Sequence, residues 1–311
     1  MPPDAAPPLW EISRRSHLSA WRVFNSVLDT VFYDVGALSS WERARLSTYT
    51  TPEGSILIVY PANAGHEIRT LTPAAFVREQ LVGTNDPVAT VVIAGVGSSA
   101  VGTAALARDV ADTIGTPVAG VVSGYGLADV AAEALAGWFV FGARNMLRET
   151  VARLLDAYGL KDHVRDPETH RDLKVHVAAP DTPNERFLYG SPDSTTLLYL
   201  LSRLGDRLRL LVGHSKGNYS IENALEGWLG FPHGDLCIVT LGAVIWFPPE
   251  FTELYQFIGD IDYFGMLNSR MFVQRIGVPG AWHSLNTALP GYLSVREALE
   301  AVSRLRSLQH A

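Results

Sequence analysis

The residues with the clearest chemical meaning are a serine and two glycines spaced as Gly213-x-Ser215-x-Gly217. The apolar run "RLRLLVG" (207–213) precedes the serine, and the helix-like stretch "NYSIENALEGWLG" (218–230) follows it. At a sharp strand-to-helix turn a serine lifts its hydroxyl above the sheet, and neighbours without side chains let strand and helix approach. The spacing therefore predicts a nucleophilic serine at position 215.

A serine hydroxyl needs a base to remove its proton, and a carboxylate must orient that base. Three histidines follow Ser215: His233 precedes a predicted strand at the wrong sheet edge, His310 is the penultimate residue, and His283 lies in the Gly/Pro-rich "GVPGAWHSLN". We therefore predict His283 as the base. His214 adjoins the serine, but adjacent turn residues point in divergent directions, so we interpret it as a packed or hydrogen-bonded histidine.

Three aspartates lie between the serine and His283, and each is a candidate for the orienting acid. Asp235 precedes its predicted strand and therefore faces the opposite edge of the sheet. Asp260 and Asp262 both follow "ELYQFIG" (253–259) at the edge where Ser215 is expected. From position alone, both remain candidates.

The segment "VGHSKGN" (212–218) resembles the nucleophile turn of the lipase class-three branch of α/β-hydrolases, especially bacterial lipase-like proteins with Gly-His-Ser-Lys-Gly. That branch carries its acid in an Asp-x-Val-Pro-x-Leu type segment. "DYFGMLN" is similar when read from Asp262, with Leu267 in the leucine position. The resemblance thus implies Asp262 as the acid and leaves Asp260 as the alternative. Two positions depart from the family: Asn218 replaces a glycine, and Gly265 replaces the proline.

The resemblance spans about residues 88–290 in its order of elements and implies an α/β-hydrolase fold. It also implies hydrolysis of carboxylic esters by a lipase or esterase through an acyl-enzyme. Such chemistry needs N–H donors for the oxyanion, and one is expected from the backbone of Lys216. The other is expected from "AGVGSSAVG" (94–102), where Gly97 and Ser98 are the candidates; the family's Ser or Thr in this loop favours Ser98.

The elements that must position these residues alternate along the chain. Short β-branched runs predict strands at 55–60, 88–97, 117–126, 207–213, 235–242 and 253–259. Helices are predicted at 98–115, from 127, at 194–205, 218–230 and 294–308, the last opening with a capping box of Ser294 and Glu297. This alternation predicts an α/β fold: a mainly parallel sheet with helices on both faces.

We expect an N-terminal extension at 1–50, partly helical, followed by a hydrolase domain at 51–311. A charged, Pro-containing stretch at 143–193 interrupts the alternation and is interpreted as a cap-like insertion. The apolar segments 244–251 and 137–142 would either line an acyl pocket or form a lid, or belong to the core. Both interpretations stay open.

Composition and charge exclude several classes of partner and of structural feature. The 311 residues carry a net charge of −7 with scattered Lys and Arg, which argues against a nucleic-acid partner. No run of 18 uncharged apolar residues predicts a membrane span, and one cysteine excludes an internal disulfide. No ligand spacing points to a metal, and no cofactor is expected. The N-terminus lacks the pattern of a secretory signal, so a cytoplasmic location is expected.

The expected substrate is a small-molecule or lipid-like acyl ester. Two alternatives remain: a non-catalytic protein of the same fold that binds a ligand or partner, and an acyltransferase or thioesterase that uses the same residues. The sequence leaves the acyl chain length and the oligomeric state open.

Overall fold

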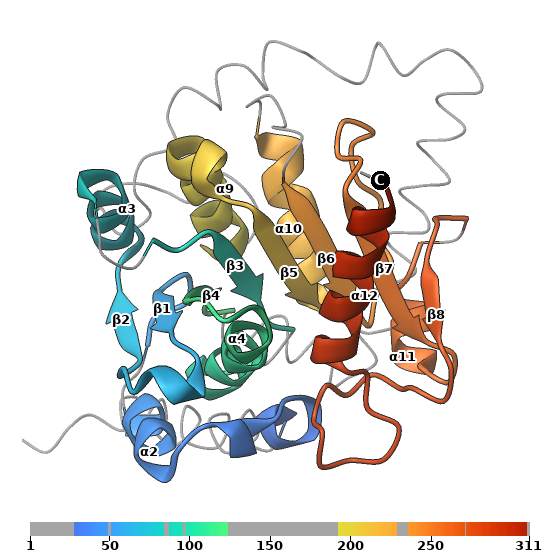
Figure 1. Cartoon of the computed structure of the whole chain (residues 1–311), viewed down its shortest axis with the longest axis horizontal. Coiled ribbons are helices and arrows are strands. Elements are labelled where there is room, and N and C mark those ends of the chain that lie inside the picture. The colour runs from blue at the N-terminus through green and yellow to red at the C-terminus, as the bar shows by residue number, and fades with distance from the viewer. Residues whose placement is uncertain are drawn as a thin grey trace, which may run out of the picture.

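A computed structural model describes residues 28–48, 51–83, 87–95, 98–123, 192–228, 236–270 and 272–309 (Figure 1). The predicted helix from 127, the apolar segment 137–142 and nearly all of the proposed insertion at 143–193 lie outside these ranges. Gly97, His233 and His310 also lie outside them.

The described strands form one eight-stranded sheet in the order β2-β1-β4-β3-β5-β6-β7-β8. Their bounds are β1 Ile56–Val59, β2 Arg69–Leu71, β3 Thr90–Ile93, β4 Val118–Val121, β5 Leu210–His214, β6 Cys237–Leu241, β7 Leu254–Gly259 and β8 Ile276–Val278. From β4 to β8 every neighbouring pair is parallel, whereas β1 is antiparallel to both β4 and β2. The predicted α/β class with a mainly parallel sheet is confirmed.

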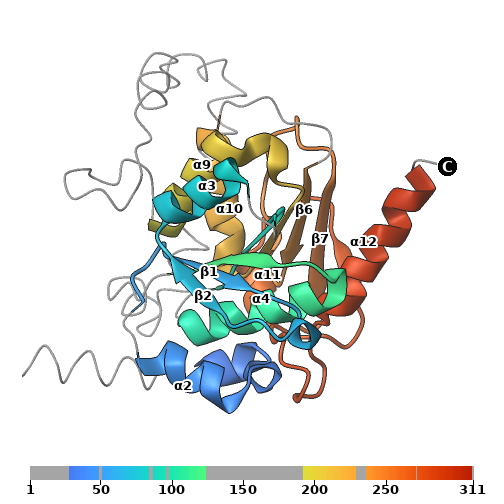
Figure 2. The ribbon, with the colours of Figure 1, turned by 60° about the vertical axis from the view of Figure 1, so that its left-hand side comes forward.

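Helices cover both faces of this sheet, as predicted (Figures 1 and 2). On one face α4 packs against β1, β3 and β4, and it also contacts α2 and α12. On the other face α10 packs against β5 and β3. The helix α9 lies between α10 and α3 and contacts both. The bounds are α2 Ser40–Thr48, α3 Pro73–Val82, α4 Ala100–Ile114, α9 Pro192–Leu204, α10 Lys216–Gly227, α11 Tyr263–Leu267 and α12 Val295–Gln309, with 3-10 turns η1 Val35–Ala37, η2 Ala62–Ala64 and η4 Gly205–Arg207.

Alternation of side chains along the strands divides the core into two clusters. In β5, Leu211 packs with the α9 and α10 layer, while its neighbour Val212 packs with the α4 and α12 layer. In β3, Val91 and Val92 divide in the same way. Because both faces are buried, the strands read in sequence as continuous apolar runs. These apolar runs are the pattern from which the strands were predicted.

Serine side chains cap the starts of α4 and α12. Ser99 caps α4 by accepting a hydrogen bond from the backbone N–H of Val101 at 3.0 Å, and Gly115 ends the helix at φ 73°. Ser294 accepts from the N–H of Glu297 at 3.2 Å at the start of α12. These caps satisfy backbone groups that would otherwise lack partners.

Residues 28–48 pack onto the same core as the sheet. Residues 28–32 are helical, and Tyr33 and Leu38 are buried in the cluster that contains α4 and α12. The domain boundary at residue 50 remains a prediction. Within the described ranges, no helix combines the length and apolar character needed to cross a bilayer.

Candidate active site

Ser215 lies at the turn between β5 and α10, with φ 52° and ψ −119°. A positive φ is uncommon for a residue other than glycine, and such strain clusters at functional sites. The backbone N–H of Ser215 donates to the carbonyl of Leu241 in β6 at 3.0 Å, which holds the turn against the next strand. The predicted strand–turn–helix setting of the serine is present.

The glycines on either side of the serine are required by close approach. A Cβ at Gly217 would lie 2.2 Å from the carbonyl oxygen of Ile93 in β3. A Cβ at Gly213 would lie 2.3 Å from Oδ1 of Asn218 and 2.8 Å from Cδ1 of Ile221. The helix therefore starts directly over the sheet. A side chain at position 217 would meet the main chain of β3, and one at position 213 would meet side chains of α10.

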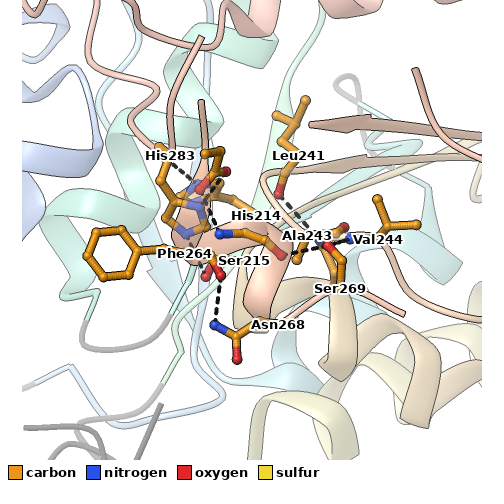
Figure 3. Close-up of polar contacts among 12 residues, drawn as sticks. His214, Ser215, Leu241, Ala243, Val244, Phe264, Asn268, Ser269 and His283 are labelled. Carbon is orange, nitrogen blue, oxygen red and sulfur yellow. Dashed lines mark hydrogen bonds and ion pairs between the residues drawn. The ribbon is translucent and has the colours of Figure 1, made fainter. Parts of the chain in front are cut away.

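Figure 3 shows His283 beside Ser215. Its Nε2 lies 3.0 Å from Ser215 Oγ, although 68 residues separate the two in sequence. His283 follows β8, and its side chain is only 2% exposed. The structure thus brings the predicted nucleophile and the predicted base into hydrogen-bonding contact.

Asp262 supplies the carboxylate on the other side of the imidazole. Its Oδ2 lies 2.8 Å from Nδ1 of His283, and its side chain is fully buried. Its Oδ1 accepts from the backbone N–H of Gly265 at 2.6 Å, which caps α11 and fixes the carboxylate. Asp260 instead accepts from the backbone N–H of Gly280 at 2.7 Å and is exposed. Of the two candidate acids, Asp262 is the one that contacts the histidine.

These contacts assign one consistent set of protons. A carboxylate only accepts, so Nδ1 of His283 carries the proton that is donated to Asp262. Nε2 is then free of a proton and accepts from the hydroxyl of Ser215. This is the tautomer in which an imidazole can act as a base toward the serine.

All of these residues gather at one edge of the sheet because their strands are parallel. Ser215 follows β5, Asp262 follows β7 and His283 follows β8, while Gly95 follows β3. Ligands of open α/β sheets bind outside the carboxyl ends of the strands. The location agrees with a site for a small molecule.

Lys216 is the first residue of α10, so its backbone N–H lies at the positive end of the helix dipole beside Ser215. Gly95 approaches the serine closely, because a Cβ there would lie 3.1 Å from Ser215 Cβ. Ser98 is buried, and its hydroxyl donates to the backbone carbonyl oxygen of Ser99 at 3.3 Å. Gly97 lies outside the described residues. The oxyanion roles of Lys216, Ser98 and Gly97 remain predictions.

Asn218 and Gly265, which differ from the pattern of the resembled family, both have a structural role. The Asn218 side chain donates to the carbonyls of Leu241 and Ala243 at 3.0 and 2.9 Å, and so ties α10 to the end of β6. A Cβ at Gly265 would lie 2.2 Å from the carbonyl oxygen of Gly242. Glycine at position 265 therefore lets α11 lie directly on the turn that follows β6.

His214 is buried and hydrogen-bonded, in agreement with its interpretation from sequence. Its Nδ1 lies 2.9 Å from the hydroxyl of Tyr33, and its Nε2 lies 3.0 Å from the carbonyl oxygen of His283. Burial lowers the pKa of His214 well below its ordinary value, and the nearby His283 lowers it further. His214 is therefore neutral. Sequence reasoning missed Tyr33, which belongs to no recognisable motif.

The segment 244–251 belongs largely to the core. Ile245, Phe247 and Phe251 are buried in the cluster with α9 and α10, whereas Trp246 is 41% exposed. Exposed apolar side chains gather instead around α11, next to Asp262: Ile261, Tyr263, Phe264, Met266 and Leu267.

In the described part of the chain, no group of three or more His, Cys, Asp or Glu side chains is arranged to hold a metal ion. Comparison with known proteins finds no matching family model, no matching curated protein and no matching solved structure.

Proposed function

We propose that this chain is a serine hydrolase of the α/β-hydrolase type that cleaves carboxylic esters. The observation that carries the proposal is the chain of contacts from Ser215 Oγ to His283 Nε2 at 3.0 Å and from His283 Nδ1 to Asp262 Oδ2 at 2.8 Å. Together with the positive φ of the serine, this arrangement is the one that activates a hydroxyl for attack on a carbonyl.

In the proposed reaction, Ser215 Oγ attacks the ester carbonyl carbon while its proton passes to Nε2 of His283. The negative charge moves to the carbonyl oxygen, where the N–H of Lys216 at the start of α10 supports it. Collapse of this intermediate breaks the bond to the leaving alcohol, which takes the proton from Nε2. Water then attacks the acyl-serine with His283 as its base, and the acid and free Ser215 are released.

Asp262 does not take up the proton in this scheme. Its carboxylate holds the imidazole in the tautomer that has a bare Nε2 and stabilises the imidazolium that forms. The backbone N–H of Gly265 keeps Oδ1 occupied, so that Oδ2 is aimed at the histidine. Each partner of the imidazole is thus fixed before substrate arrives.

The apolar residues around α11 favour an ester with an apolar acyl or alcohol group. Tyr263, Phe264 and Leu267 are 74%, 53% and 58% exposed and lie within five residues of Asp262. Contiguous exposed apolar surface commonly marks a place of interaction. Esters of this kind include both lipids and smaller synthetic compounds.

The test is ester turnover by purified protein and its Ser215→Ala variant, with p-nitrophenyl esters as substrates. Loss of turnover with an unchanged melting temperature supports the proposal. Ser202→Ala is the matched control, because that hydroxyl donates to the carbonyl of Leu198 within its own helix, α9. Full turnover in Ser215→Ala would show that this serine is not the nucleophile, whereas no turnover in the unaltered folded protein would favour the non-catalytic alternative. Product analysis with added alcohol separates hydrolysis from acyl transfer, and acyl-thioester substrates test for a thioesterase.

A further inference from the structure

Residues 28–34 lie between two loops of the candidate site and are hydrogen-bonded to both. On one side the main-chain carbonyls of Thr30, Val31 and Phe32 accept from Asn286 Nδ2, Ser284 Oγ and the N–H of Leu285 at 2.6, 2.6 and 2.8 Å. These three donors directly follow His283. The segment therefore supports the loop that carries the base.

On its other side the same segment binds the loop after β3. The hydroxyl of Tyr33 accepts from the backbone N–H of Gly95 at 2.6 Å, and Asp29 accepts from the N–H of Ser99 at 3.2 Å. Gly95 lies close to Ser215, because a hypothetical Cβ on this glycine would be 3.1 Å from Ser215 Cβ. Tyr33 thus reaches the surroundings of the nucleophile from a position 182 residues earlier in the chain.

His214 connects Tyr33 to His283, because its two ring nitrogens contact one residue each. A carbonyl oxygen only accepts, so the bond of 3.0 Å to His283 requires that Nε2 of His214 carries the proton. Nδ1 is then bare and accepts from the hydroxyl of Tyr33 at 2.9 Å. The hydroxyl in turn accepts from Gly95, so each donor in this chain has one acceptor.

We propose that Tyr33 and His214 are positioning residues, which hold the main chain of His283 so that its imidazole stays in hydrogen-bonding contact with Ser215. The inference rests on the proposed function, because it concerns the geometry of the same base. Phe32 contributes to this arrangement through an edge-on ring contact with His283 at 5.7 Å. Tyr33 and His214 touch no reacting atom themselves.

The first test is Tyr33→Phe, which removes one hydroxyl and keeps the ring that packs edge-on against His214 at 5.3 Å. Small displacements of a catalytic group cost up to about 100-fold in rate. We therefore expect kcat for p-nitrophenyl esters to fall about 10- to 100-fold, with KM within about twofold of the unaltered protein. The rate is normalised to the fraction of folded chains measured by circular dichroism, because fluorophosphonate labelling itself depends on the base.

Tyr255→Phe is the matched control. Tyr255 is also buried, belongs to the same core cluster and loses a hydrogen bond, to Glu253 at 3.1 Å. It lies near the start of β7, at the opposite end of that strand from Asp262. A merely structural role for Tyr33 predicts similar kcat per folded chain in both variants, and that result would overturn the inference.

A second pair of variants tests the inference if Tyr33→Phe folds poorly. His214→Phe removes both hydrogen bonds and keeps a ring, whereas His214→Gln retains an N–H donor for the carbonyl of His283. We expect kcat of His214→Gln to be at least about fivefold higher than kcat of His214→Phe. Equal kcat in the two variants would refute the positioning role. Absence of labelling and turnover in the unaltered protein would remove the proposed function itself, and this inference with it.

Discussion

Nδ1 of His283 lies 2.8 Å from Oδ2 of Asp262, whereas Asp260, two residues earlier, binds the backbone of Gly280 at the surface. Two aspartates that sequence position alone could not separate therefore have different partners. The difference arises because Asp262 caps α11 and turns into the buried side of the loop.

This difference predicts unequal effects of two similar substitutions. Asp262→Asn removes the acceptor that fixes the imidazole tautomer, so kcat for p-nitrophenyl esters should fall about 10⁴-fold. Asp260→Asn should leave kcat within about twofold, because its partner is a surface backbone N–H. Steady-state kinetics of the two variants decide the assignment. A larger loss in Asp260→Asn would transfer the role of the acid to that residue.

The glycine after the nucleophile predicts an effect on stability. Gly217→Ala places a Cβ 2.2 Å from the carbonyl oxygen of Ile93, so backbone must move, at a cost of about 1–3 kcal/mol. For a chain of this size the melting temperature should fall several degrees. Gly277→Ala in β8 is the control, since a Cβ there meets nothing within 4 Å. Equal melting temperatures for the two variants would contradict the close approach.

The apolar side chains of α11 predict a preference for longer acyl chains. Leu267→Ser removes an exposed apolar side chain that the acyl chain of the ester would cover. Each methylene buried in such a contact contributes about 0.8 kcal/mol to binding. We expect kcat/KM for the octanoate ester to fall about 5- to 10-fold relative to the acetate ester. Leu305→Ser on α12, also an exposed leucine, should leave the ratio unchanged. If Leu267→Ser, like Leu305→Ser, left the octanoate-to-acetate ratio of kcat/KM unchanged, Leu267 of α11 would not contact the acyl group.

Asp109 of α4 predicts a pH dependence of stability. Burial first, and then the nearby carboxylates of Asp34 and Asp112, raise its pKa to about 8 against the opposing charge of Arg296. The folded chain holds this proton more tightly than the unfolded chain, so the free energy of unfolding falls as pH rises from about 4 to about 8.

Asp109→Asn removes this titration. Because Asp109 is partly exposed, solvent reduces the effect, and we expect a gain of about 1–2 kcal/mol in unfolding free energy at pH 9. The gain should vanish near pH 4. Urea unfolding of both proteins at the two pH values measures it, and a gain that is the same at both would refute the titration of Asp109.

Much of the fold could be predicted because its strands are buried on both faces. The runs that became β3, β5, β6 and β7 are apolar, β-branched and bounded by turns. Both β2 and β8 were missed, because each has only three residues, too few to show a strand pattern in the sequence. The helix α3 was also missed, although Thr72 caps it and Pro73 begins it.

In the candidate site, too, some residues could be recognised from the sequence and others could not. Ser215, His283 and Asp262 could be proposed from spacing, chain order and a family resemblance. Tyr33 could not, because its importance comes only from where residues 28–34 lie between two distant loops. A hydrogen bond between residues 181 positions apart leaves no periodicity in the sequence.

The most direct test of the account is mass spectrometry after reaction with a fluorophosphonate probe. The contacts from Ser215 to His283 and Asp262 predict one adduct per chain, on the peptide that contains Ser215, and no adduct when His283→Ala removes the base. An adduct on a different serine, or no adduct in the unaltered folded protein, would contradict the central claim that this hydroxyl is the nucleophile.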